Sequence, residues 1–574
     1  MADYIKTYER TAFEGELSDG DIILKGGVTS GLVYPYAILE LATKFRFRSI
    51  GGTSVGALAA AFAAAAEYSR GARGDAGGFL RMQARCEALP ELLKGLFQAS
   101  PRYRDLMRFA MRAQTRRSPL PMVWDLVSTF WLTTLAGLTV GAALMELTQS
   151  GPFAIGLGML LGAVLALAAR IGLQVLDLPN HAFGMCPGLA QPGYSGPALT
   201  DWMHQSIQDI AFGDPDHPFP LTFGDLAAAD PPIDLRVITS NLSMGRPHTL
   251  PAFRLDAGYD PAAWARLFPA PVTAYLAARA EPLTGWAGEH PYKAFPAGDG
   301  LPLVIAARLS LSLPFVFTAV PMHMADLQGA ALAAATGGDG TVRLRRVWFS
   351  DGGLASNFPI HMFDGLLPTR PTFALSLDDL PPGADRDGPR VFITAPDAEG
   401  AGLPVSAVNN LAAFTNSLMA SAKDWQDNLL AGMPGQRERI ARVLLDPATE
   451  GGFNLTMPRS AARVLMGYGL AAGQRLLGGL DFEEHCYRRA LISYEQLETA
   501  IGSLGRTWKG GFAALFARQS EVSTAYPRLG QDERDFIAAR LGVLADVALD
   551  PPPIGEPDAK FPRPQGRLRI SPNT

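Results

Sequence analysis

Ser54 is the residue of this chain best suited to covalent chemistry. It lies in the stretch GTSVG (Gly52–Gly56), between an apolar segment with the pattern of a strand and an alanine-rich segment with the pattern of a helix. A serine on a sharp strand-to-helix turn needs small neighbours, because the backbone is strained and other elements approach closely. The turn exposes the hydroxyl at the positive end of the following helix. Ser54 is therefore a candidate nucleophile, with Gly52 and Gly56 as its supports.

A second glycine-rich turn precedes the serine in the chain. KGGVTSG (Lys25–Gly31) also follows a strand-like run and precedes a helical one. Backbone N–H groups in such a turn bind anions or stabilise the oxyanion of a tetrahedral intermediate. The candidates for that role are Gly26, Gly27 and Val28. A nucleotide phosphate loop is disfavoured, because Val28 holds the slot of the second glycine in Gly-x-Gly-x-x-Gly and no Gly-Lys-Ser/Thr follows.

A serine nucleophile also needs a base, and Asp351 is the candidate. It directly follows the apolar run Val347–Phe349 and precedes Gly352 and Gly353. An aspartate at the carboxyl edge of a parallel sheet lies where such folds build their sites. The alternative is a Ser–His–Asp triad, and His361 is the histidine nearest to Asp351 in the sequence. A helix-start or packing role is favoured for that histidine.

The elements that must position these residues follow the order strand, turn, helix, repeated twice. Strands are expected at 22–24 and 45–50, with a helix between them and another over 57–67. This order predicts a parallel sheet covered by helices. Further strands are expected at 233–242, 346–353 and 371–380. Helices are expected to dominate beyond residue 400, and a proline-rich tail closes the chain.

Taken together, these blocks resemble the patatin-like phospholipases, a family of lipid acyl hydrolases. The matching blocks come in the family's order, over roughly residues 20–80 and 230–380: GGVTSG (Gly26–Gly31), GTSVG (Gly52–Gly56), AARLSLSLPFVFTAVP (Ala306–Pro321), DGG (Asp351–Gly353) and the Asn-x-Pro continuation at Asn357. In one respect the chain departs from the family pattern. Val28 and Ser30 stand where the family usually has a third glycine and a basic residue, although Lys25 lies just before the turn.

The resemblance implies an α/β, three-layer patatin-like fold with a mainly parallel central sheet. It also implies a two-residue centre, in which Asp351 takes the proton of Ser54 without a histidine. Gly26, Gly27 and Val28 would hold the oxyanion, and an acyl-enzyme would form and be hydrolysed. The glycines that would support the motifs are Gly31, Gly52, Gly56, Gly352 and Gly353. No metal or cofactor is expected.

Two long uncharged segments interrupt the α/β pattern. Residues 126–145 and 152–169 carry no charge and are joined by six residues. Because a bilayer core takes about 20 apolar residues of helix, they predict an inserted transmembrane hairpin; a buried helical pair or an apolar lid is the alternative. Arginines flank the pair and none lies at its tip, so both ends are expected in the cytoplasm. No cleavable secretory signal is expected.

A basic stretch precedes the hairpin. Arg104, Arg108, Arg112 and Arg116 recur every four residues and would share one helical face. Beside a hydrophobic pair, such a face is suited to an anionic lipid leaflet. An ordinary solvated helix face is the other reading.

Composition narrows the classes of protein. The net charge of −5 gives no reason to expect nucleic acid as a partner. The three cysteines are far apart in the sequence, which fits a reducing compartment. The expected division is a patatin-like domain over 1–117 and 179–400, the hairpin at 118–178, a helical part at 401–548 and a tail at 549–574. The expected substrate is a membrane phospholipid or another lipid ester, and a catalytically silent membrane scaffold is the rival from another class.

Overall fold

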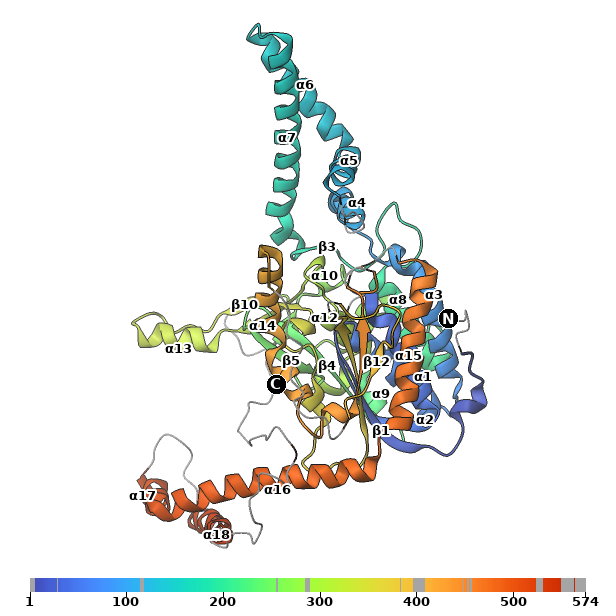
Figure 1. Cartoon of the computed structure of the whole chain (residues 1–574). Helices are drawn as coiled ribbons and strands as arrows, with labels where there is room; N and C mark the ends of the chain where they lie inside the picture. The colour runs from blue at the N-terminus through green and yellow to red at the C-terminus, as the bar shows by residue number, and fades with distance from the viewer. Residues whose placement is uncertain are drawn as a thin grey trace.

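The structure is a computed structural model of the whole chain. It describes residues 6–27, 29–113, 118–253, 257–283, 290–381, 383–395, 408–447, 449–451, 454, 457–522, 530–548 and 562. Figure 1 shows a central body, a helical hairpin that rises from one end of it, and a helical arm at the opposite end.

A single large sheet forms the centre of the body. Its order is β12-β13-β11-β1-β2-β4-β10-β9-β6-β7, and β5 pairs with β4. The strands are β1 Ser18–Leu24, β2 Phe45–Thr53, β4 Asp234–Asn241, β5 Arg246–Leu250, β6 Ala257–Tyr259, β7 Lys293–Ala294, β9 Val320–Ala325, β10 Leu344–Ser350, β11 Thr372–Asp379, β12 Val391–Phe392 and β13 Ile440–Leu445. A separate two-stranded sheet joins β3 (Gly184–Cys186) to β8 (Phe315–Phe317).

The prediction of a mainly parallel sheet is wrong. Strands β13, β11, β1, β2 and β4 pair in parallel. Every other pairing described in this sheet is antiparallel: β4 with β10 and β5, β10 with β9, β9 with β6, β6 with β7, and β12 with β13. The βαβα segment predicted a parallel centre, which the structure has. In the flanks, β5 follows β4 after a short loop and folds back on it, as antiparallel neighbours can.

Alternate side chains of β1 enter two different cores. Ile22 and Leu24 belong to the main core, whereas Ile23 belongs to a smaller cluster with Phe358 and Ile360. Successive side chains of a strand point to opposite faces of the sheet. The sheet is therefore covered on both faces, which makes the body three layers deep.

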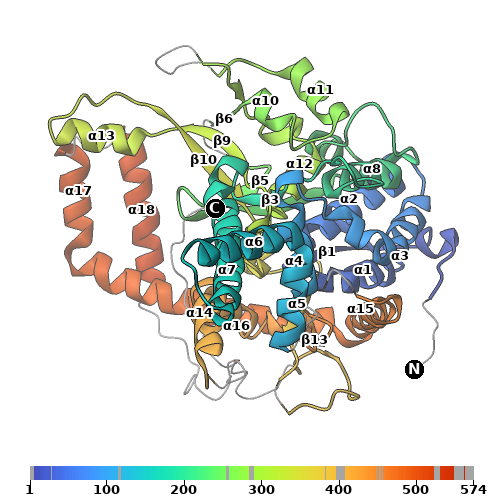
Figure 2. The same ribbon diagram turned by 90° about the horizontal axis from the view of Figure 1, so that it is seen from above.

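Helices account for most of the remaining described chain. They are α1 Tyr34–Ala42, α2 Val55–Ala72, α3 Gly77–Leu96, α4 Arg104–Ala113, α5 Pro119–Thr129, α6 Trp131–Leu147, α7 Pro152–Asp177, α8 Leu199–Phe212, α9 Phe223–Ala227, α10 Pro261–Trp264, α11 Ala270–Arg279, α12 Leu303–Ser310, α13 Leu327–Ala335, α14 Leu411–Ala431, α15 Arg459–Gly479, α16 Phe482–Thr507, α17 Ala513–Val522 and α18 Gln531–Val547. Seen from the hairpin side, α4 to α7 lie over the middle of the body (Figure 2).

The prediction of two straight membrane spans needs correction. Among the described residues, one helix is long and apolar enough to cross a membrane, Pro152–His181. The first predicted span, 126–145, is broken at Phe130, whose backbone leaves the helical region. Helices α5 and α6 meet there at 90°, so they reach the length of a span only if the bent pair is counted as one.

Glycines hold α6 and α7 together. A Cβ atom on Gly137 would collide with the carbonyl of Gly162, and one on Gly141 with the carbonyl of Gly158. Gly156 on α7 faces open space. The two backbones therefore approach more closely at the first four positions than any side chain would permit, as small residues allow in helix pairs.

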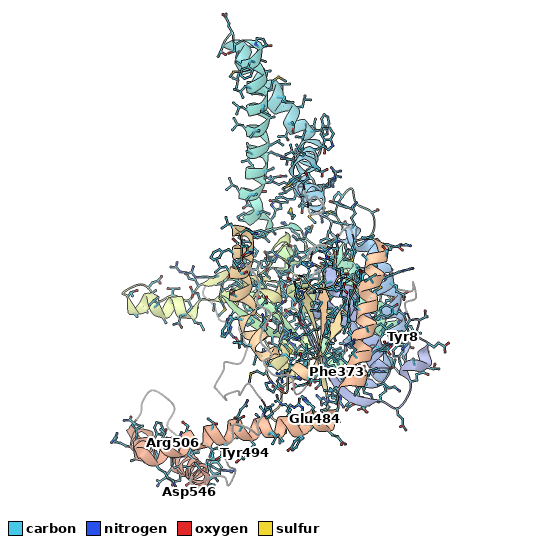
Figure 3. All side chains as sticks on the ribbon, in the orientation of Figure 1. Tyr8, Phe373, Glu484, Tyr494, Arg506 and Asp546 are labelled. Carbon is cyan, nitrogen blue, oxygen red and sulfur yellow. The ribbon has the colours of Figure 1, made fainter. Side chains whose placement is uncertain are left out.

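The part beyond residue 400 is not only helical. Strand β13 pairs in parallel with β11 and so belongs to the central sheet, a pairing that was not predicted. Helices α16 to α18 form the arm. Figure 3 shows Glu484, Tyr494 and Arg506 along α16, away from Phe373 in the body.

We expect Gly141→Ala to loosen the hairpin, because the added methyl group meets backbone rather than a movable side chain. Overpacking of this kind costs about 1–3 kcal/mol, so the amides of α6 should exchange with deuterium roughly tenfold faster or more. Hydrogen exchange of the full chain in detergent micelles measures this. Gly156→Ala is the matched control and should leave exchange unchanged or slower; equal behaviour of the two variants would contradict the packing.

Candidate active site

Ser54 lies at the turn between β2 and α2, in a conformation that side chains rarely adopt. Its φ is 55° and its ψ is −128°. A Cβ atom on Gly52 would collide with the carbonyl of Gly56, and one on Gly56 would meet the carbonyls of Leu24 and Lys25 at the end of β1. Both glycines are therefore required by the close packing around the turn. The strain places the Ser54 side chain at the start of α2.

The hydroxyl of Ser54 meets the carboxylate of Asp351. Ser54 Oγ donates to Asp351 Oδ2 at 2.6 Å, across 297 positions of sequence. Both residues are 4% exposed. Asp351 Oδ1 accepts the N–H of Gly353 at 2.8 Å, which orients the carboxylate. The structure thus brings together the two residues that the sequence proposed as nucleophile and base.

Asp351 reaches the site from an antiparallel strand. The prediction placed it at the end of a parallel strand, but β10 runs opposite to β4, with Ser350 beside Ser240. The last residues of β10 overlap the last residues of β4, so Asp351 still arrives near the carboxyl edge of the parallel strands. Gly352 is needed directly after it, because a Cβ atom there would collide with the carbonyl of Ile238.

The loop after β1 lies against the same hydroxyl. The carbonyl oxygen of Gly27 is 3.2 Å from Ser54 Oγ. The N–H of Gly26 donates to the carbonyl of Asn357 at 2.8 Å. The Gly26 N–H, predicted to hold an oxyanion, is therefore engaged with Asn357 in this structure. Val28 lies outside the described residues. Gly31 packs against Val55, the first residue of α2.

Lys25, the basic residue beside this loop, forms an ion pair with a neighbouring strand. Lys25 Nζ forms a 2.6 Å ion pair with Asp378 at the end of β11, and Arg442 reaches the same carboxylate. These cations hold the pKa of Asp378 below its usual value despite burial, which raises it. Lys25 thus fastens the loop to the neighbouring strand.

Two serines that were not predicted as site residues hold the turn. Ser310 Oγ accepts the N–H of Ser54 at 2.8 Å and donates to the carbonyl of Ile238 at 2.6 Å. The carbonyl of Ser312 accepts the N–H of Asp351 at 3.0 Å. The segment Ala306–Pro321 was noticed as a motif, but its spacing alone does not say which serine bonds to which strand.

A buried carboxylate from the C-terminal part holds the Asn357 segment. Asp427 Oδ2, on α14, accepts the N–H groups of Asn357 at 2.7 Å and Phe358 at 2.8 Å. Burial raises the pKa of Asp427, and these two N–H groups oppose the rise. No sequence signal singled it out, because it lies outside every recognised motif.

An apolar cavity opens beside Ser54. The empty space there, open solvent included, is about 890 Å³. Its walls come from α2, α3, α8 and the chain around β8, with Phe62, Leu93, Trp202 and Phe317 among them. Cys86 also lines it, and burial raises the pKa of that thiol to about 12, so the wall stays uncharged. Apolar walls beside a nucleophile suit a flexible apolar ligand.

The other groups predicted or considered from the sequence differ from this pair in their burial and bonding. His361 is exposed, whereas Ser54 and Asp351 are buried. On α4, Arg104 donates to the carbonyl of Pro192 in the body, while Arg108 and Arg112 are exposed. Arg116 lies outside the described residues. Within the described ranges, no three His, Cys, Asp or Glu side chains gather as a metal-binding group.

Comparison with known proteins gives a relative across most of the chain. A Rhizobium meliloti protein named RpoH suppressor is 33% identical over 544 residues, which cover 82% of this chain and 84% of the relative. The chain belongs to the RpoH suppressor family. No protein-family model matches the sequence. Among solved structures, the crystal structure of VipD from Legionella pneumophila covers 92% of this chain and 85% of its own, at 12% identity and a TM-score of 0.31.

In this member of the RpoH suppressor family, Ser310→Ala should destabilise the fold. The change leaves the Ser54 N–H and the Ile238 carbonyl without their shared partner, which costs about 1–3 kcal/mol for buried groups. Urea unfolding of the two proteins measures the loss. Ser520→Ala, whose hydrogen bond is exposed, is the control and should change stability by less than about 0.5 kcal/mol. Equal midpoints for both variants would refute the bridging role.

Proposed function

We propose that this chain is a lipid acyl hydrolase of the patatin-like phospholipase type. The observation that carries the proposal is the 2.6 Å hydrogen bond from Ser54 to Asp351 beside an apolar cavity. A nucleophile in the wall of an apolar cavity, paired with a base, suits the hydrolysis of an ester with a long acyl chain.

The proposed reaction proceeds through an acyl-enzyme. Asp351 accepts the proton as Ser54 Oγ bonds to the ester carbonyl carbon, and the carbonyl oxygen becomes an oxyanion. The Gly27 segment and the positive end of α2 are the proposed cradle for that charge. When the tetrahedral intermediate collapses, the alcohol leaves with the proton from Asp351. Water then attacks the acyl-enzyme and gives one proton to Asp351. When this second tetrahedral intermediate collapses, Asp351 returns that proton to Ser54 Oγ and the fatty acid leaves.

The burial of Ser54 and Asp351 supports this reaction. A free aspartate is a weak base at neutral pH, since its ordinary pKa is about 3.9. A short hydrogen bond in a site from which water is largely excluded strengthens the interaction between hydroxyl and carboxylate. The proposed dyad therefore depends on the burial of both residues.

The cavity is close to both roots of the hairpin. Leu96 and Phe97 line it just before the chain enters α4, and Phe317 lines it from β8, whose partner β3 directly follows α7. A membrane-inserted hairpin would hold this part of the cavity wall next to the lipid. We therefore propose a membrane phospholipid as substrate and a catalytic body on the cytoplasmic face, with the exposed Arg108 and Arg112 near anionic head groups.

A fluorophosphonate probe tests the nucleophile. We expect it to label the full chain and to leave Ser54→Ala unlabelled, because the probe traps the activated serine. In Asp351→Asn the labelling rate should fall by about 10²-fold or more, since the base is gone. Ser520→Ala should label like the original chain. Labelling that persists in Ser54→Ala, or a folded original chain that does not label, would support a silent scaffold instead.

The cavity predicts that the enzyme prefers long acyl chains. Filling the cavity should shift that preference toward shorter acyl chains. Ala59→Trp on α2 would fill the cavity wall. We expect p-nitrophenyl palmitate hydrolysis to fall about tenfold or more while butyrate hydrolysis changes little, because each lost methylene contact weakens binding by up to a few kcal/mol.

Ala514→Trp on α17, an exposed position, is the matched control and should alter neither rate. Fluorophosphonate labelling of Ala59→Trp verifies that the turn is intact. An unchanged ratio of palmitate to butyrate rates in that variant would show that the acyl chain lies elsewhere.

A further inference from the structure

Helix α14 presents a stripe of large apolar side chains to solvent. The side chains of the stripe are between 52% and 80% exposed and are spaced so that they share one helical face: Leu411, Phe414, Leu418, Trp425 and Leu429. We call this set the α14 stripe. Large apolar side chains that gather on one exposed face mark an interaction surface.

The inward face of the same helix is tied to the candidate active site. Asp427, 5% exposed, accepts the N–H groups of both Asn357 and Phe358. Ala431 lies in the small core under the sheet with Phe358 and Ile360. The helix therefore holds the Asn357 segment by two charge-assisted hydrogen bonds and by apolar packing.

The Asn357 segment also contacts the loop after β1, which lies beside Ser54. Its carbonyl accepts the N–H of Gly26, and its side-chain oxygen lies so close to Gly26 that a Cβ atom there would collide with it. That same Cβ would be 3.3 Å from the Cβ of Ser54. A displacement of α14 is therefore passed by hydrogen bonds and direct contact to the loop beside the nucleophile.

Placement favours a lipid surface as the partner of the stripe. One end of α14 points toward the foot of α7, on the side of the body from which the hairpin rises (Figure 1), and the view from above also has α14 near α7 (Figure 2). Helix α7 belongs to the one described segment that is long and apolar enough to cross a membrane. A bilayer that receives α7 lies next to this end of α14.

We infer that α14 docks its stripe on the lipid bilayer, and that docking positions the Asn357 segment and thereby the Ser54 turn. The coupling half of this inference rests on the proposed function, whereas the docking half rests on the α14 stripe and on its position beside a bilayer that receives α7. The device would make the enzyme more active on a lipid surface than on an ester dissolved in water.

Docking is measured without any turnover. The full chain carrying Cys486→Ser and Leu418→Cys is labelled with an environment-sensitive fluorophore and reconstituted into vesicles of phosphatidylcholine and phosphatidylglycerol. The other two cysteines, Cys86 and Cys186, are buried. Spin-labelled phospholipids should quench the probe at position 418 severalfold more than a probe placed at the exposed Thr499 of α16.

Equal quenching at the two positions would overturn docking. So would a probe at 418 that is shielded only as protein concentration rises, because a second copy of the chain would then cover the stripe. A probe that is already shielded in detergent without lipid would show that the chain covers its own stripe, and would overturn the inference as well.

Coupling is measured as the ratio of two rates: hydrolysis of phospholipid in vesicles and of soluble p-nitrophenyl butyrate. Leu418→Asp should lower the vesicle rate about tenfold and leave the soluble rate nearly unchanged. Leu497→Asp, an exposed leucine on α16, is the control and should preserve both rates. A ratio that does not move in Leu418→Asp would refute coupling even if the probe at 418 is quenched.

Asp427→Asn tests the hydrogen bonds between α14 and the Asn357 segment without changing the α14 stripe. It keeps the shape of the side chain but weakens the bonds to the Asn357 segment, so lipid quenching at 418 should persist while the vesicle rate falls. Loss of quenching in this variant would contradict the assignment of Asp427 to the link. If the original chain hydrolyses neither substrate, the proposed function fails, and quenching at 418 still decides the docking half.

Discussion

The left-handed backbone of Ser54 is the constraint on which the centre of this molecule depends. A non-glycine residue in such a conformation costs about 1–3 kcal/mol and persists only where its surroundings over-determine it. Here Ser310 holds its N–H, Asp351 holds its hydroxyl, and the glycines on either side let β1 and the start of α2 close around it. A relaxed turn at this point would separate the hydroxyl from the carboxylate.

The two faces of the sheet contribute different structures around that turn. On the main-core face, α2, α3 and α8 enclose the apolar cavity whose wall includes Ser54. On the other face, Phe358, Ile360 and the end of α14 form the smaller core and hold the Asn357 segment. The proposed chemistry thus lies between an apolar binding space and a support built by the C-terminal part, which is also the part that contributes β13.

Sequence reasoning was most accurate where the signal is local. Strands at β1, β2, β4, β10 and β11 were predicted because each is a short apolar run closed by a turn residue. The break at Phe130 was missed, since an uncharged run records apolar length and not the direction of the helix axis. Strand β13 was missed because an isolated run amid helices carries no sign of the partner β11. The use of the Gly26 N–H by Asn357 joins residues more than three hundred positions apart.

The sequence by itself determined the kinds of residue and their local frames: a serine between glycines at a strand-to-helix turn, an aspartate before two glycines, and a long apolar insertion. These follow from steric and solvation rules that act over a few residues. Only the tertiary structure decided that Asp351 arrives on an antiparallel strand, that Gly26 is not a free donor, and that Asp427 braces the Asn357 segment. Each of those depends on a contact between distant segments, and a contact of that kind is set by packing, which no short stretch of sequence contains.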